Sequence, residues 1–210
     1  MFRFNKQIRS NRKNGTGKSH LVLLVPAIWI CTAVMIFRLV GLSPISTGPP
    51  AWAQEPSGEY RLKAAFLYNF VKFAEWPTTS FADGHAPFVI CIAGNDSFAL
   101  ILKDLDGKLV RDRPLVTKPV HTNGNLIGCH LLYIGPGELK QTDNILQTLQ
   151  KAPVLTVCDV QDCAEAGIMI NMRMAENRVA LDLNLVAVQQ AQLKLSSQLI
   201  KLTRIVKGYP

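Results

Sequence analysis

Four cysteines carry the clearest chemical signal in this sequence of 210 residues. They follow a long N-terminal stretch that holds the fifth cysteine, and they are Cys91, Cys129, Cys158 and Cys163. An even number of cysteines in an exported chain favours disulfides. Cys158 and Cys163 are separated by four residues, a spacing that matches neither the C-x-x-C redox motif nor a paired zinc knuckle. Four cysteines allow three pairings, and their spacing alone leaves all of them open.

Histidines and serines give no catalytic or metal-binding pattern. His85 and His121 fall in predicted loops without an acidic residue in a supporting arrangement. Cys129 and His130 are adjacent on a predicted strand, where their side chains should point to opposite faces, so they are not expected to share a metal ion. Ser196 suits the N-cap of a helix, and the sequence has no G-x-S-x-G nucleophile elbow. We therefore expect a protein that is not an enzyme and that holds no metal or cofactor.

Arg178, Asp182 and Asn184 are polar residues whose spacing indicates a shared surface. They alternate along one predicted strand, so their side chains should project from one face while the apolar residues between them face inward. A solvated face is the plain interpretation. The alternative is a polar patch that binds a partner.

One amphipathic helix is predicted to organise the chain, in residues 59–77 with the sequence EYRLKAAFLYNFVKFAEWP. At about 100° per residue its apolar side chains fill one wide arc, which favours a broad buried face. Lys63 alone breaks that arc, and in the first turn it is expected to snorkel to water. Pro77 should end the helix. The polar stripe is expected to be solvated, or alternatively to meet a partner through Tyr68, Asn69, Lys72 and Trp76.

The N-terminal part has the composition of an export signal. Seven of the 23 Lys and Arg residues lie in residues 1–53, which contain no Asp or Glu. An apolar core follows in residues 21–37, and Ala51–Ala53 form an A-x-A cleavage site. We expect residues 1–53 to be a signal peptide, or alternatively an uncleaved inner-membrane anchor, and residues 54–210 to be a periplasmic domain. That domain has 16 basic and 15 acidic residues, so its charge gives no reason to expect nucleic-acid binding.

Residues 54–210 alternate between short apolar runs and helical stretches. Strands are predicted at 87–93, 109–120, 129–134, 153–158, 168–174 and 178–184. Helices are predicted at 96–105, 138–151 and 185–207, the last with a break and a new cap at Ser196. The 109–120 strand contains two prolines and should lie near a sheet edge, and the 159–167 loop should hold Asp159 and Asp162 in a solvated turn. This order of elements predicts a single α/β domain with a mostly parallel sheet and helices on both faces.

With these elements placed, six blocks of the sequence resemble the YfiR family. In chain order they are EYRLKAAFLYNFVKFAEWP, PFVICIAG, GCHLLYIG, PVLTVCD with AGIMINM, RVALDLNL, and LKLSSQLIKLTRIV. Together they span about residues 59–206, nearly the whole predicted domain. One position departs from the family pattern, because Leu181 precedes Asp182 where the family usually has phenylalanine before its acidic residue. That departure weakens any transfer of partner contacts, although not of the fold.

The resemblance implies a small exported regulator. Such a protein would bind and repress the periplasmic sensor domain of a membrane diguanylate cyclase (YfiN-like), in cyclic-di-GMP signalling and biofilm control. It would be released by redox state or by an outer-membrane lipoprotein (YfiB-like), and it would form a homodimer. The alternative is a periplasmic small-molecule-binding module that feeds a membrane receptor or histidine kinase, with its site at the carboxyl ends of the strands.

Strand positions and the resemblance together favour the disulfide pairs Cys91–Cys129 and Cys158–Cys163. The second pair closes a short loop that is expected to be exposed, so reductant should reach it first. This makes it the better candidate for a redox-sensitive element.

Overall fold

The computed structural model describes residues 58–150, 152–175 and 178–208. All of them belong to one unit, Gln54–Pro210. The predicted leader, with its apolar core and its cleavage site, lies outside the described residues. Among the helices of the described ranges, none is both long and apolar enough to cross a membrane.

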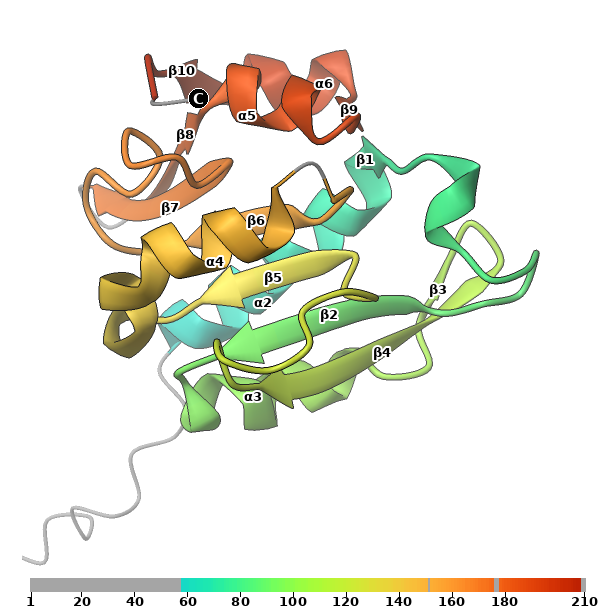
Figure 1. The fold of residues 1–210 in the computed structure, drawn as a ribbon. Helices are drawn as coiled ribbons and strands as arrows, with labels where there is room; N and C mark the ends of the chain where they lie inside the picture. Colours follow the sequence, from blue (N-terminus) through green and yellow to red (C-terminus); the bar gives the residue numbers. More distant parts are fainter. Residues whose placement is uncertain (1–57, 151, 176–177, 209–210) are drawn as a thin grey trace, which may run out of the picture. The chain divides into compact units, whose positions relative to one another are not determined.

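An eight-stranded sheet forms the middle of the fold, with the strand order β10–β8–β7–β6–β5–β2–β4–β3 (Figure 1). The strands are β2 (Phe88–Ala93), β3 (Leu109–Val110), β4 (Arg113–Val120), β5 (Leu131–Ile134), β6 (Leu155–Cys158), β7 (Ile170–Ala175), β8 (Arg178–Leu183) and β10 (Thr203–Ile205). Neighbours from β4 to β7 run parallel, whereas β8 runs antiparallel to β7 and β3 runs antiparallel to β4. The predicted α/β domain with a mostly parallel sheet is confirmed.

Helices cover the two faces of the sheet unequally. One face packs against α2 (Gly58–Phe73), α3 (Asp96–Leu102), α5 (Leu185–Gln190) and α6 (Ser197–Lys201). The other face packs against α4 (Thr142–Leu149), which lies in front of β5 and β6 in Figure 1. Three short 3₁₀ helices complete the described helical elements: η1 (Thr78–Ser80), η2 (Lys103–Leu105) and η3 (Pro136–Gln141).

Two apolar cores therefore lie on opposite sides of the sheet. In β5, Leu131 and Tyr133 belong to the core under α2, while Leu132 and Ile134 belong to the core under α4. All four are fully buried, because successive side chains of a strand point to opposite faces and both faces are covered. This double burial explains why the central strands are continuous apolar runs.

The organising helix is shorter than predicted. It ends at Phe73, and Ala74–Glu75 form strand β1, which pairs with β9 (Lys194–Leu195) in a separate two-stranded sheet. The guanidinium of Arg111 donates to the backbone carbonyl oxygens of Lys72 and Ala74 at 2.9 and 3.0 Å. Long-range partners thus end the helix three residues before the position that Pro77 alone would dictate.

The C-terminal helix prediction was right about the break and the Ser196 cap, but it was wrong beyond Lys201. Gln192 adopts a left-handed φ of 57°, which stops α5, and the predicted Ser196 cap then starts α6 by accepting from the Leu199 N–H at 3.2 Å. Residues 203–205 form β10, which pairs in parallel with β8. Thr203, Ile205 and Val206 are β-branched and favour this extended state. At the opposite end of the sheet, the β3–β4 hairpin occupies the edge predicted for the 109–120 strand.

Candidate functional site: the Asp182 cluster and the Cys158–Cys163 loop

The structure contains the disulfides Cys91–Cys129 and Cys158–Cys163, with Cα separations of 5.8 and 6.7 Å. Cys91 lies on β2, and Cys129 lies two residues before β5, the neighbouring strand. The pairing therefore joins two adjacent central strands. Cys158 is the last residue of β6, so its bridge to Cys163 closes the loop that follows that strand.

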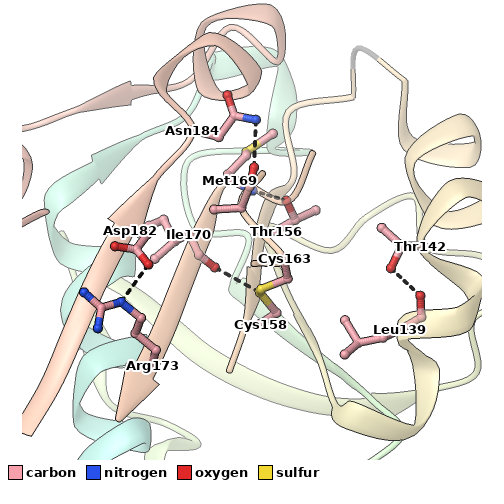
Figure 2. Close-up of a disulfide and its surroundings, with 11 residues drawn as sticks. Leu139, Thr142, Thr156, Cys158, Cys163, Met169, Ile170, Arg173, Asp182 and Asn184 are labelled. Atoms are coloured by element: carbon pink, nitrogen blue, oxygen red, sulfur yellow. Dashed lines mark hydrogen bonds and ion pairs between the residues drawn. A yellow bond between two sulfur atoms is a disulfide. The ribbon is translucent and has the colours of Figure 1, made fainter. Parts of the chain in front are cut away.

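Both residues of the short disulfide are buried, which contradicts the expected exposure. The exposed fractions of Cys158 and Cys163 are 0% and 4%. Figure 2 shows Cys158 Sγ facing the Ile170 carbonyl oxygen, 3.7 Å away. Both cysteines pack with Ile168 in the core under α4. The loop folds back over the sheet instead of standing in solvent, so reductant gains no advantage at this bridge over Cys91–Cys129, whose residues are 0% and 6% exposed.

Asp182 is the centre of a charged cluster that spans three neighbouring strands. It is 1% exposed, and its two carboxylate oxygens accept from Arg173 Nε at 2.9 Å and Arg204 Nε at 2.8 Å. The strand register places Asp182 opposite Asn171 of β7 and Arg204 of β10, so these side chains share one face of the sheet. Burial by itself would raise the pKa of Asp182, but the hydrogen bonds and charges of Arg204 and Arg173 outweigh burial and lower it.

The expected solvated face of β8 is instead largely covered. Arg178 is exposed, but Asp182 and Asn184 are buried. Asn184 donates through Nδ2 to the Ala164 carbonyl oxygen at 3.2 Å, and its Oδ1 accepts from the Ala187 N–H at the start of α5. Ala164, directly after the Cys158–Cys163 loop, therefore covers this face at Asn184, and Arg173 and Arg204 cover it at Asp182. Asp182 and Asn184 hold the region together and do not present themselves to a partner in this structure.

Lys63 and Asp159 form a buried ion pair that sequence reasoning missed. Lys63 Nζ lies 2.6 Å from Asp159 Oδ2 and 2.6 Å from Glu59 Oε1. The side chains of Lys63 and Asp159 are each 5% exposed, so the expected snorkelling lysine and solvated aspartate were both wrong. Burial by itself would lower the pKa of Lys63, but its two carboxylate partners outweigh burial and raise it. The available signal was a single lysine on an apolar helix face together with an acid directly after a buried strand.

The contact residues predicted on the 59–77 helix fall into two groups. Tyr68 and Asn69 are half-buried and Lys72 is exposed. The Lys72 and Lys108 ammonium groups lie 5.4 and 5.9 Å from the centroid of the Tyr68 ring. Trp76 is only 9% exposed, and its Nε1 donates to the His130 carbonyl oxygen at 3.0 Å. Trp76 is thus a core residue, while the other three remain on the surface.

These α2 residues and the Asp182 cluster are not brought together. The helix covers one face of the sheet through residues such as Leu67 and Phe70. Leu181 and Leu183 point into that same core, so Asp182 between them points to the opposite face. The two sets of predicted partner residues therefore belong to different sides of the sheet.

His130 sits in an aromatic cluster on the α2 side of the sheet. Its ring stacks on Phe81 with centroids 4.5 Å apart. Nδ1 accepts from the Val89 N–H at 3.1 Å, and Nε2 lies 3.2 Å from the Ser80 carbonyl oxygen, which assigns the proton to Nε2. Burial lowers the pKa of His130, with the Arg113 charge adding to the effect and the Ser80 carbonyl opposing it. Cys129 points to the other core, so the two side chains do lie on opposite sides as expected, although both residues precede β5 and are not part of it.

A cavity of about 590 Å³ opens beside the Asp182 cluster. Its walls are formed by Asp159, Gln161, Asp162, Arg173, Met174 and Arg204. It lies at the carboxyl ends of β6 and β7, because Asp159 follows β6 directly and Arg173 and Met174 lie near the end of β7. The crevice between β2 and β5 is filled, because a Cβ on Gly135 would lie 2.8 Å from the Gly94 carbonyl oxygen and the Glu138 side chain covers Gly94. Among the residues that the structure describes, no group of three or more His, Cys, Asp or Glu side chains is arranged to hold a metal ion.

The fold and these sites define an α/β domain with two disulfides and a charged cavity beside one of them. A family model described as YfiR/HmsC-like matches residues 60–204, which covers most of the chain. The chain belongs to this family. None of the curated proteins matches the chain closely enough to count as a relative. Membership supports, in general terms, a periplasmic regulator of cyclic-di-GMP signalling in a family that is regulatory and not enzymatic, and two disulfides are consistent with an oxidising compartment.

Proposed function

We propose that this protein binds the periplasmic sensor domain of a membrane diguanylate cyclase and represses the synthesis of cyclic-di-GMP. The observation that carries this proposal is the family match over residues 60–204. An outer-membrane lipoprotein that relieves repression, and a homodimer, are further parts of the proposal that follow from the same family membership.

The polar stripe of α2 is the surface that we propose for the cyclase. Tyr68, Asn69 and Lys72 are accessible along one side of this helix. Tyr68 lies between the ammonium groups of Lys72 and Lys108, and tyrosine is one of the residues enriched in interface hot spots. Arg178 is an exposed candidate on the other face of the sheet. Trp76, Asp182 and Asn184 would support these surfaces from within the fold.

Gene deletion and complementation test the proposal. Deletion should raise cellular cyclic-di-GMP and surface attachment, and the wild-type gene should restore both. Complementation by Tyr68→Ala with Lys72→Glu should fail if the α2 stripe contacts the cyclase, because hot-spot truncation typically costs about 2 kcal/mol or more of binding free energy. Lys140→Glu, which reverses an exposed charge on η3, is the matched control and should restore repression. Unchanged cyclic-di-GMP on deletion would reject the cyclase as the target.

A second candidate function is a small-molecule-binding module that feeds a membrane receptor or histidine kinase. The cavity beside Asp182 favours it, because a cavity of about 590 Å³ lined by side chains of both charges is within the size range of ligand sites. Unchanged cyclic-di-GMP in the deletion strain, together with altered phosphorylation of a neighbouring kinase, would favour this function over the first.

A further inference from the structure

The cavity beside Asp182 has one wall that presents guanidinium groups. Arg173 of β7 and Arg204 of β10 each use Nε to bind Asp182. In the described ranges, the terminal Nη atoms of both arginines make no hydrogen bond. Their side chains are 34% and 61% exposed, so these donors are reachable from the cavity. Paired guanidinium forks that are held in position by another group suit a carboxylate ligand.

The opposite wall is acidic and belongs to the loop between Cys158 and Cys163. Asp159 and Asp162 line the cavity there. Asp159 is already paired with Lys63, whereas the exposed carboxylate of Asp162 makes no hydrogen bond or ion pair with any described residue. Asp182 is the main cause that raises the pKa of Arg204, and the charges of Glu165 and Asp162 add to it. Asp162 and Arg204 both line the cavity without forming an ion pair, so the cavity offers groups of opposite charge to a ligand.

We propose that this cavity binds a small zwitterion, whose carboxylate lies on Arg173 and Arg204 and whose ammonium group lies on Asp162. A plain anion would be repelled by the acidic wall, and a plain cation would be repelled by the two arginines, whereas a molecule with both charges satisfies both walls. Asp182 is a positioning residue for this site, because it orients both guanidinium groups from beneath. The proposal does not depend on the identity of the membrane partner.

The binding of this zwitterion should be coupled to the Cys158–Cys163 disulfide. Asp159, Gln161 and Asp162 all lie between the two cysteines, so the disulfide constrains the whole acidic wall. A ligand that joins this wall to β7 and β10 stabilises the closed loop by mass action. Because both sulfurs are buried, reduction requires the loop to open, and the bound ligand should slow that opening.

Calorimetric titration of the purified, oxidised full-length protein tests the site directly. The probes are glycine, 4-aminobutanoate and 6-aminohexanoate, which are zwitterions of increasing charge separation, with acetate and methylammonium as the two half-ligands. At least one zwitterion should bind about tenfold more tightly than either half-ligand, because the second charge contact adds a charge-assisted hydrogen bond. Acetate that binds as tightly as the best zwitterion would make this a simple anion site, and the absence of binding by all three zwitterions would reject the site.

Two variants and two controls locate the site. Arg204→Gln and Asp162→Asn should each lower the affinity for the tightest-binding zwitterion by about tenfold or more. Asn tolerates the left-handed φ of 61° at position 162, so Asp162→Asn keeps the backbone and decides the matter even if Arg204→Gln is unstable. Lys201→Gln and Asp143→Asn, which change exposed groups outside the cavity, should leave the affinity unchanged. Equal affinities for Asp162→Asn and the wild type would overturn the proposal.

Reduction kinetics give an independent readout. The half-life of Cys158–Cys163 in dithiothreitol should lengthen when the best zwitterion is present, and that of Cys91–Cys129 should not. Equal slowing of both disulfides would mean that the ligand stabilises the whole fold without acting on this loop, and it would reject the proposed coupling. These measurements use only the purified protein, so their failure is distinguishable from a failure of cyclase repression in cells.

Discussion

Lys63→Met is expected to be among the most damaging single substitutions on α2, although methionine matches the apolar surroundings of the lysine. The substitution removes the ammonium group from Asp159, whose side chain is 5% exposed and which approaches Lys63 to 2.6 Å. Removal of one partner from a buried pair leaves an uncompensated charge, which typically costs about 3–5 kcal/mol of unfolding free energy. Against a typical total stability of about 5–15 kcal/mol, the loss should be easily measured.

Two further variants separate the ion pair from simple packing. The double variant Lys63→Met/Asp159→Leu removes both charges. It should recover most of the unfolding free energy lost in Lys63→Met, since an apolar replacement of a buried pair is often neutral or stabilising by about 1–4 kcal/mol. Lys72→Met makes the same substitution at an exposed position of the same helix. It should change the unfolding free energy by no more than about 0.5 kcal/mol.

Urea unfolding of the oxidised protein, followed by circular dichroism, measures all three variants. The denaturant dependence should keep its slope while the midpoint moves, since the surface exposed on unfolding is nearly unchanged. If Lys63→Met lowers the unfolding free energy by less than about 1 kcal/mol, the pair behaves like an exposed ion pair, and water must reach Asp159 in the folded protein. If the double variant is as unstable as the single one, the loss comes from packing and the electrostatic reasoning fails.

Three other predictions follow from the buried polar groups and the disulfides. Because the pKa of His130 is lowered from 6.5, its neutral form is favoured in the fold. Its contribution to stability should be full above pH 6.5 and be lost as pH falls through the lowered pKa. Unfolding free energies between about pH 7 and about pH 5 should fall less steeply for His130→Gln than for the wild type, while the exposed His85→Gln keeps the wild-type slope. Asp182→Asn should cost about 1.5–3 kcal/mol in urea unfolding, because a buried carboxylate loses its charge-assisted hydrogen bonds while the two partly exposed arginines stay solvated. Asp104→Asn, at an exposed position, should change the unfolding free energy by no more than about 0.5 kcal/mol. Equal losses for Asp104→Asn and Asp182→Asn would show that the ion-pair cluster around Asp182 does not stabilise the fold. Replacement of both Cys91 and Cys129 by serine should lower the unfolding free energy by about 4 kcal/mol, and replacement of both Cys158 and Cys163 by about 2 kcal/mol. The difference arises because the two disulfides close loops of 38 and 5 residues. The reverse order would reject the chain-entropy argument.

The sequence by itself determined the layered α/β architecture. The central strands are short apolar runs because both of their faces are buried, and such runs are visible without any knowledge of neighbours. The amphipathic arc of α2 and the Ser196 cap were local signals of the same kind. Cys129 and His130 do lie on opposite sides of the sheet as expected, but both precede β5, so their placement comes from the turn before the strand and not from strand alternation.

Contacts between distant segments decided the rest. The end of α2 at Phe73 depends on Arg111 and on pairing with β9, and neither is encoded near residue 73. Residues 203–205 were predicted to be helical but form a strand, because they pair with the edge of β8. Propensity alone could not settle it, because tertiary pairing overrides a weak local preference.

Tertiary structure also decided which polar groups are inside. Alternation correctly put Asp182 and Asn184 on one face of β8, but it could not say that the loop around Ala164 would cover that face. Lys63 and Asp159 are 96 residues apart, and each looks solvated when taken alone. Only their approach to 2.6 Å makes burial of both tolerable, because a charge leaves water at acceptable cost only when an opposite charge is already in place. That pairing is a property of the folded chain and of neither segment.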